Sequence, residues 1–375
     1  MKEGPGAATR GRAPGGGAPA GGAPIDGRGA RSNRAGRFER TRVAPRDEPD
    51  PVLDEEEPAP LATTVTPEKT RTIISTNDSP DVPFDQSINP YRGCEHGCVY
   101  CFARPTHSYL GLSPGLDFET KLFSKPDAAA LLREELRRPS YKVSTIALGA
   151  NTDPYQPIER RLGITRSVLE VLAEHRHPTA IVTKSALVLR DLDILKAMAA
   201  DRLVAVMISV TTLDRSLARR MEPRAATPPR RIEAIRALSA AGLPVGVLAS
   251  PMIPGLNDAE VEAILAAAAE AGARSAGYVV LRLPHEIKDL FREWLEAYVP
   301  LRAKHVLSLV RDLRDGALYD ATFGKRMKGV GPQADLLRRR FEVARRRLGL
   351  LARPAPLDHS LFRVPPRAGD QASLF

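Results

Sequence analysis

The chain has 375 residues, 55 basic against 45 acidic side chains, and 43% hydrophobic residues. This composition excludes disorder of the whole chain, and the length fits two or three domains at most. No window of 18 uncharged apolar residues and no apolar N-terminal stretch is present, so we expect neither a membrane-spanning helix nor secretion.

The net charge of +10 is spread unevenly along the chain. Residues 1–46 hold ten basic and three acidic side chains, and residues 47–57 hold seven acidic and no basic ones. Residues 325–347 hold nine basic and two acidic side chains, which makes them a potential contact for nucleic acid. An amphipathic helix with a solvated arginine face is the plain alternative for that segment.

The N-terminal residues 1–79 are expected to form a disordered arm. Residues 1–46 carry eleven glycines and few large apolar side chains, too little to offset the entropy lost on ordering. A basic Gly/Arg-rich arm can contact nucleic acid or remain a solvated tail, and both alternatives stay open. The tail at 353–375 has four prolines and is expected to be extended or disordered.

Between these ends, short apolar runs alternate with helical periods. Strands are expected at 87–91, 143–150, 179–183, 203–210, 245–249 and 276–281. A helix at 227–241 stops at Gly242, and another follows the cap signal Asn257-Asp258. About six βα units of this kind predict a parallel sheet covered by helices, either a barrel or an open doubly wound sheet. In both folds, function belongs at the C-terminal ends of the strands.

A helical cap is expected at 301–352, after a core at 80–300. One face of its last helix carries Leu337, Phe341, Ala344 and Leu348, with arginines on the other face. Such a cap would be placed to close the mouth of a barrel.

The three cysteines, Cys94, Cys98 and Cys101, follow the first expected strand with the spacing C-x3-C-x2-C. Three cysteines so close together cannot form a disulfide framework, which indicates a reducing compartment such as the cytoplasm. Thiolates favour zinc or iron–sulfur clusters. A structural zinc site needs a fourth ligand, for which His107 is available, and an electron-carrying cluster normally has four cysteines. Three ligands on a four-iron cluster leave one iron open.

The motif and its surroundings resemble those of a known superfamily. An aromatic residue before the third cysteine, with βα units behind it, resembles the signature of radical S-adenosylmethionine (SAM) enzymes. The phrases NPYRGC at 89–94, TDPYQPIE at 152–159 and PMIPGLND at 251–258 look like the spore photoproduct lyase-related, DNA repair photolyase-like branch. The resemblance covers about residues 80–300 and implies a partial (βα)6 TIM-like barrel.

The resemblance also implies cofactors and chemistry. Cys94, Cys98 and Cys101 would hold a [4Fe–4S] cluster whose open iron binds SAM, and one electron from a reduced flavodoxin- or ferredoxin-type donor would cleave SAM. The deoxyadenosyl radical formed would take a hydrogen atom from the substrate. That substrate is a nucleic acid, a protein or a small molecule, and a non-SAM iron–sulfur or zinc protein is the alternative.

Candidate SAM contacts lie after successive strands. The aromatic Tyr100 suits adenine. Three residues, Asn151, Thr152 and Asp153, stand where the family usually has Gly-Gly-Glu, and the carboxylate of Asp153 suits the SAM ammonium group. The carboxylate or ribose would take donors from Lys184, Ser209 and Ser250. Each residue has a plain alternative as a packing or loop residue.

Other residues are less specific. Glu222 and Arg224 face ribose or substrate, or form an ion pair at a helix approach. His107 and Tyr109 line the site or pack in a loop, and His175 and His177 interact with a helix end or water.

One implied role has no residue to fill it. Spore photoproduct lyases are understood to use a cysteine outside the cluster as a late hydrogen donor, and this chain has no fourth cysteine. Tyr91, Tyr109 or Tyr155 would have to replace it.

Overall fold

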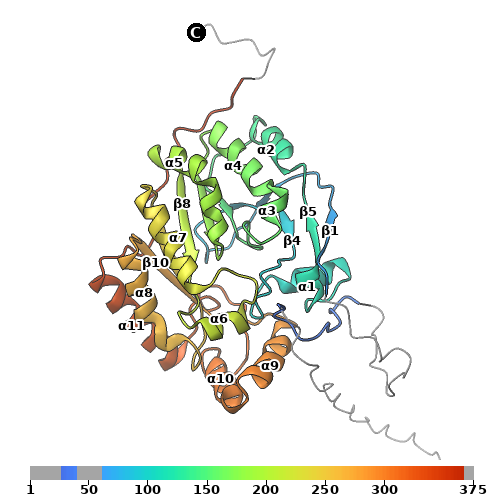
Figure 1. Cartoon of the computed structure of the whole chain (residues 1–375), viewed down its shortest axis with the longest axis vertical. Helices are drawn as coiled ribbons and strands as arrows, with labels where there is room; N and C mark the ends of the chain where they lie inside the picture. The colour runs from blue at the N-terminus through green and yellow to red at the C-terminus, as the bar shows by residue number, and fades with distance from the viewer. Residues whose placement is uncertain (1–26, 40–60, 367–375) are drawn as a thin grey trace, which may run out of the picture.

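The computed structural model describes residues 27–39 and 61–366 (Figure 1). Its main sheet has seven strands in the order β10-β9-β8-β7-β6-β3-β2. Six neighbouring strands of this sheet run parallel to one another: β3 (Gln86–Ile88), β6 (Ile146–Leu148), β7 (Thr179–Thr183), β8 (Val204–Ser209), β9 (Val245–Met252) and β10 (Ser275–Val280). An antiparallel strand, β2 (Ile74–Thr76), forms the edge beside β3. The expected parallel sheet is therefore confirmed, and each expected strand overlaps an observed one.

Helices follow the strands because apolar side chains recur at helical spacing between them. These are α2 (Ala128–Leu136), α3 (Glu159–Leu162), α4 (Ile164–Glu174), η2 (Ala186–Asp191), α5 (Leu192–Ala200), α6 (Arg215–Met221), α7 (Pro228–Ala240), η3 (Asp258–Glu260), α8 (Val261–Glu270), α9 (Ile287–Tyr298), α10 (Pro300–Asp312) and α11 (Gly331–Arg347). None of the helices within the described ranges is long and apolar enough to cross a membrane.

A second, small sheet lies beside the cysteine loop. It pairs β1 (Thr64–Pro67) with β5 (Lys121–Ser124), and β5 with β4 (Tyr91–Arg92). Two short helices, η1 (Arg104–Leu110) and α1 (Asp117–Thr120), connect the cysteines to β5. The small sheet thus combines strands that precede the cysteines, β1 and β4, with β5, which follows them.

The expected arm at 1–79 is corrected for the residues that the structure describes. Residues 61–79 include β1 and β2, and in the segment 27–39 Arg28 and Ala30 are buried. Composition missed this order because β1 pairs with β5 at 121–124 and the segment 27–39 bonds to Glu119, both far along the chain. Residues 1–26 and 40–60 lie outside the described residues.

Two local expectations are corrected by burial. The side chain of Asn257 makes no capping hydrogen bond: it accepts from the Ile253 amide at 2.6 Å and donates to the Thr211 carbonyl at 2.7 Å. The helix α8 instead begins at Val261, after a 3-10 turn. His177 is fully buried rather than solvated, and its ring contacts Phe362 from the C-terminal tail. The described part of that tail therefore packs on the body.

The C-terminal helix α11 has the expected buried apolar face, but it does not lie at the mouth of the sheet. Leu337, Phe341 and Ala344 of α11 are buried, and the Phe341 ring lies 4.6 Å from that of Tyr278 on β10. α11 lies beside α8 along the β10 side of the sheet (Figure 1). It is not the part of the cap that reaches the strand ends, because the only cap residue on the cavity described below is Met327 from the preceding loop.

Candidate active site

A cavity of about 260 Å³ lies at the C-terminal ends of the parallel strands. Its wall collects residues from the cysteine loop and from the ends of five successive strands. Among them are the three cysteines and all seven residues named as candidate SAM contacts: Cys94, Cys98, Tyr100, Cys101, Asn151, Thr152, Asp153, Lys184, Ser209 and Ser250. Because parallel strands end on one edge of a sheet, these residues meet at one site although Cys94 and Ser250 are 156 positions apart.

The cysteine loop turns back on itself at two glycines. Gly93 and Gly97 have φ of +77° and +66°, a conformation that side chains disfavour. Burial raises the pKa of the Cys94 thiol well above its usual range, so a thiolate there needs a compensating cation. Three thiols on one cavity wall are a donor set that suits an iron–sulfur cluster. In the described ranges, no three His, Cys, Asp or Glu side chains are placed to hold a single metal ion.

Asp153 is fixed in place by its neighbours on β7. Its carboxylate accepts from the Thr183 hydroxyl at 2.6 Å and from the Lys184 amide at 2.8 Å. His96, from the cysteine loop, lies 3.4 Å away. Burial raises the pKa of Asp153, but His96 and these hydrogen bonds outweigh it and bring the pKa to about 2. The cavity therefore has a fixed negative charge beside the cysteine loop.

Lys184 supplies a positive charge on the same wall. Its ammonium group donates to the Ser209 hydroxyl at 2.8 Å and lies 5.8 Å from the centre of the Tyr100 ring. Ser209 in turn donates to the Ser250 carbonyl at 3.1 Å. These contacts join the ends of β7, β8 and β9, and they leave an ammonium group on the cavity wall where an anionic group can bind.

Glu222 was considered as a contact to ribose or substrate, but it does not line the cavity. Its carboxylate accepts from the Tyr100 hydroxyl and from the Thr211 hydroxyl, and it pairs with the guanidinium of Arg231. Burial raises the pKa of Glu222, but Arg231 and Lys184 outweigh it and bring the pKa to about 2. Glu222 thus orients the Tyr100 ring through its hydroxyl without lining the cavity itself. Arg224 pairs with Glu95 and does not line the cavity.

The buried Glu222–Arg231 pair is expected to contribute to the stability of the fold. Both side chains are at most 1% exposed, so Glu222→Gln leaves a buried guanidinium without its counter-charge. We expect the free energy of unfolding of the cluster-free protein to fall by about 3 kcal/mol in urea titrations. Glu262→Gln breaks an exposed pair with Arg340 and should cost less than about 1 kcal/mol. Equal losses in the two variants would contradict this assignment.

Several cavity residues were missed by the sequence analysis. His96, Phe102, Arg282 and Met327 line the wall together with apolar residues of the strands. Arg282 could have been found, because it directly follows the strand expected at 276–281. Met327 could not, since it comes from a loop with no motif.

Other residues that were considered lie elsewhere. Tyr109 is 68% exposed, and fully buried His107 bonds through Nε2 to the Lys121 carbonyl at 2.9 Å. Neither residue, nor Tyr91 or Tyr155, lines the cavity.

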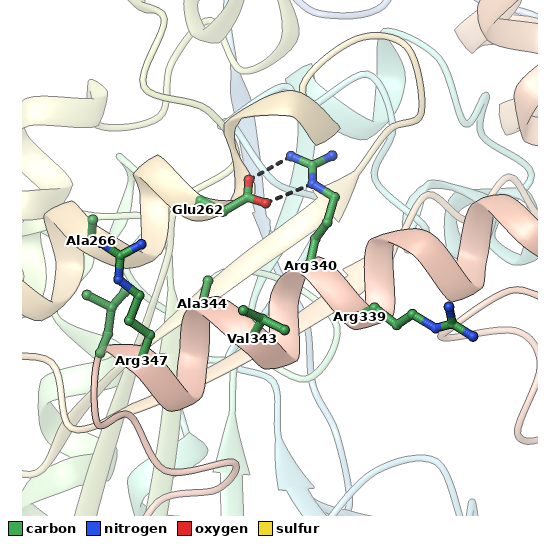
Figure 2. Close-up of a pocket in the computed structure, with 8 residues that line it drawn as sticks. Glu262, Ala266, Arg339, Arg340, Val343, Ala344 and Arg347 are labelled. Atoms are coloured by element: carbon green, nitrogen blue, oxygen red, sulfur yellow. Dashed lines mark hydrogen bonds and ion pairs between the residues drawn. The ribbon is translucent and has the colours of Figure 1, made fainter.

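The basic segment 325–347 is partly neutralised. Its ion pairs with described residues are Lys325–Asp315, Arg326–Asp81, Arg338–Asp335, Arg340–Glu262, Arg345–Glu342 and Arg346–Glu342. Figure 2 shows Arg340 of α11 reaching Glu262 on α8, while Arg339 and Arg347 flank the same groove. The positive charge of α11 is therefore smaller than its sequence indicates.

Comparisons with known proteins agree with this architecture. A family model described as the radical SAM superfamily matches residues 88–268. The uncharacterized protein Rv2578c of Mycobacterium tuberculosis is 37% identical over 299 residues, which cover 78% of this chain and 83% of the relative. The uncharacterized protein MJ0683 of Methanocaldococcus jannaschii is 29% identical over 173 residues, covering 46% of this chain and 62% of the relative.

Two solved structures share the fold. Spore photoproduct lyase complexed with dinucleoside spore photoproduct has a TM-score of 0.56 and 16% identity, covering 77% of this chain and 80% of that chain. A mutant of the same enzyme with bound AdoMet and dinucleoside spore photoproduct has a TM-score of 0.55, with the same identity and coverage. At this identity, the likeness is one of fold.

The chain therefore belongs to the radical SAM superfamily. Its cofactors are accordingly a [4Fe–4S] cluster and SAM, and it is a radical SAM enzyme that needs an electron donor.

Proposed function

We propose that Cys94, Cys98 and Cys101 hold the cluster and that SAM binds beside it in the cavity at the strand ends. The observation that carries this proposal is that all three thiols share one cavity wall with Lys184, Ser209 and Asp153. When bound, the cluster and SAM supply the chemistry of reductive SAM cleavage and hydrogen-atom abstraction from a substrate.

The protein's own residues would bind and orient SAM. We assign the SAM carboxylate to the ammonium group of Lys184 and the hydroxyl of Ser209, and the SAM ammonium to the acidic turn at Asn151–Asp153. Tyr100 would contact adenine, with its ring orientation held by the bond to Glu222. Ser250 offers a further hydroxyl toward the ribose.

The finer features of the fold and setting belong to the same proposal. We assign residues 80–300 to a partial (βα)6 barrel, which is supported by six parallel strands in chain order. Residues 301–352 form its cap, and 353–375 its tail. A reduced flavodoxin- or ferredoxin-type protein is proposed as the electron donor. Three free thiols around one cavity favour a reducing compartment such as the cytoplasm.

Anaerobic reconstitution tests the proposal directly. The protein is loaded with iron and sulfide, its iron and sulfide are counted, and SAM and dithionite are then added. We expect a four-iron cluster and slow formation of 5′-deoxyadenosine without any substrate. A protein that takes up zinc in preference to iron, or that leaves SAM intact, would exclude this function.

The assignment of Lys184 gives a further prediction. Lys184→Ala should raise the SAM concentration for half-maximal 5′-deoxyadenosine formation by about tenfold or more, because a charge-assisted hydrogen bond is lost. Iron content should not change, since Lys184 binds no iron in this proposal. Lys196→Ala, an exposed lysine on α5, is the matched control and should behave as the unmodified protein. An unchanged SAM dependence would remove Lys184 from the SAM site.

Arg282 supports an anionic substrate. This side chain lines the cavity at the end of β10, and its buried Nε has no hydrogen-bond partner among the described residues. Among the described residues, the hydrogen-bond partner of its Nη1 is the Met327 sulfur, at 3.6 Å. The nearby carboxylate of Asp81 is paired with Arg326 instead. The guanidinium lies 5.0 Å from the centre of the Phe102 ring, and Phe102 is 43% exposed. A cation beside an exposed aromatic ring suits the phosphate and base of a single-stranded nucleic acid.

Binding of nucleic acid at the cavity mouth and binding on α11 can be distinguished with a 12-nucleotide single-stranded DNA probe, followed by fluorescence anisotropy. If the cavity mouth binds nucleic acid, Arg282→Gln should weaken affinity by about tenfold and reduce the salt slope by about 1. Arg339→Gln on α11 is the matched control and should have a smaller effect. A larger effect of Arg339→Gln would place binding on α11, and the absence of binding at low salt would remove nucleic acid from the substrates.

A further inference from the structure

A short N-terminal segment, residues 28–37, lies against the cysteine loop, and we call it the clasp. Its backbone amides at Gly29 and Ala30 donate to the two carboxylate oxygens of Glu119 at 3.0 and 2.8 Å. Glu119 is fully buried at the end of α1, 90 residues further along the chain. A buried carboxylate that takes two amide donors from a distant segment holds that segment in one position.

The same carboxylate is connected to the cysteines. Glu119 pairs with fully buried Arg104 at 2.5 Å, and Arg104 donates through Nε to the Cys98 carbonyl at 2.9 Å. The Cys94 amide donates to the Phe118 carbonyl, next to Glu119, at 2.9 Å. The backbone at two of the three cysteines is therefore tied to the element that holds the clasp.

The clasp also touches the loop directly. A Cβ atom at Gly29 would lie 1.6 Å from the carbonyl oxygen of Gly97, the residue before Cys98. A Cβ atom at Gly97 would lie 2.8 Å from the carboxylate of Glu119. The two backbones and the carboxylate are packed so closely that Gly29 has no room for a side chain.

Further contacts hold the clasp at both ends. The Arg28 guanidinium donates to the Glu119 carbonyl at 3.0 Å, and Asn33 donates to Asp117 at 2.9 Å. Ser32 and Arg34 both bond to Glu293 of α9, at 2.7 and 2.5 Å. The clasp thus joins α1, the cysteine loop and α9.

We propose that the clasp is a positioning element of the cluster site, acting through Glu119 and Arg104 to keep the cysteine loop in its cluster-binding form. The inference rests on the proposed function, because it takes the three cysteines as cluster ligands. The clasp residues bind neither iron nor SAM; they fix the backbone from which the thiols project. Loosening the clasp should therefore speed cluster loss and change the environment of the cluster.

The test compares two substitutions within the clasp. Gly29→Ala displaces the clasp from Gly97, whereas Ala35 is an exposed residue of the clasp, so Ala35→Ser is the matched control. After reconstitution of the full chain, Gly29→Ala should lose its cluster to a chelator about tenfold faster than the unmodified protein. Its reduced cluster should also show a shifted reduction potential and an altered EPR spectrum. Ala35→Ser should match the unmodified protein in all three measurements.

A milder variant keeps the test decisive if Gly29→Ala fails to fold by circular dichroism. Asn33→Ala removes two hydrogen bonds to Asp117 and should give an intermediate rate of cluster loss. Unchanged cluster loss, potential and spectrum in every folded variant would overturn the clasp, while leaving the cysteine assignment intact. An unmodified protein that acquires no cluster would instead overturn the proposed function.

Discussion

Each of Cys94→Ala, Cys98→Ala and Cys101→Ala should abolish cluster binding and reduce 5′-deoxyadenosine formation to the level of a protein-free reaction. The chain contains no fourth cysteine, so no other thiol can replace a lost ligand. All three side chains line the same cavity, and each would bind a separate iron of one cluster. Removal of any one should therefore be as damaging as removal of all three.

The measurement is iron and sulfide per chain after anaerobic reconstitution, followed by quantification of 5′-deoxyadenosine. His107→Gln is the informative control, because His107 is the fourth ligand that a zinc site would need. It lies off the cavity wall and should keep its iron. A cysteine variant that retains a full cluster and activity would disprove the ligand set, and metal loss in His107→Gln would favour zinc.

The arrangement of the candidate site was predictable where it depends on strand order. Lys184 follows an apolar run that is recognisable as a buried strand, and Ser209 lies at the end of another. The ends of parallel strands converge on one edge of the sheet. Arg282 obeys the same rule at the end of β10. Local pattern thus locates the residues that face the cavity, because they need only a strand and its direction.

Residues that act through distant partners were not predictable in this way. Glu222 looks like a cavity residue in sequence, but its carboxylate bonds to the hydroxyl of Tyr100, 122 positions earlier in the chain. The clasp has a composition typical of disorder, and its order comes from Glu119. The basic face of α11 is weakened by Glu262, 78 positions away from Arg340. No local pattern reports such long-range pairs.

The likeness to spore photoproduct lyase leads to a second large expected effect, which is a missing activity. We predict that the reconstituted protein will not split dinucleoside spore photoproduct over multiple turnovers, although it will cleave SAM. The late hydrogen donor implied by the resemblance is a cysteine outside the cluster, and all three cysteines here are assigned to iron. A thiolate bound to iron has no S–H hydrogen to donate.

The tyrosines do not compensate for the missing thiol. Tyr91 is buried with its hydroxyl bonded to Glu159, Tyr155 is buried off the cavity, and Tyr109 projects into solvent. Tyr100 is the one tyrosine on the cavity wall within the described ranges, and its hydroxyl is already bonded to Glu222. Incubation with dinucleoside spore photoproduct, SAM and dithionite, followed by quantification of the released thymidine, tests this prediction. Repeated turnover would show that a hydroxyl can serve as donor, and loss of that turnover in Tyr100→Phe would identify which one.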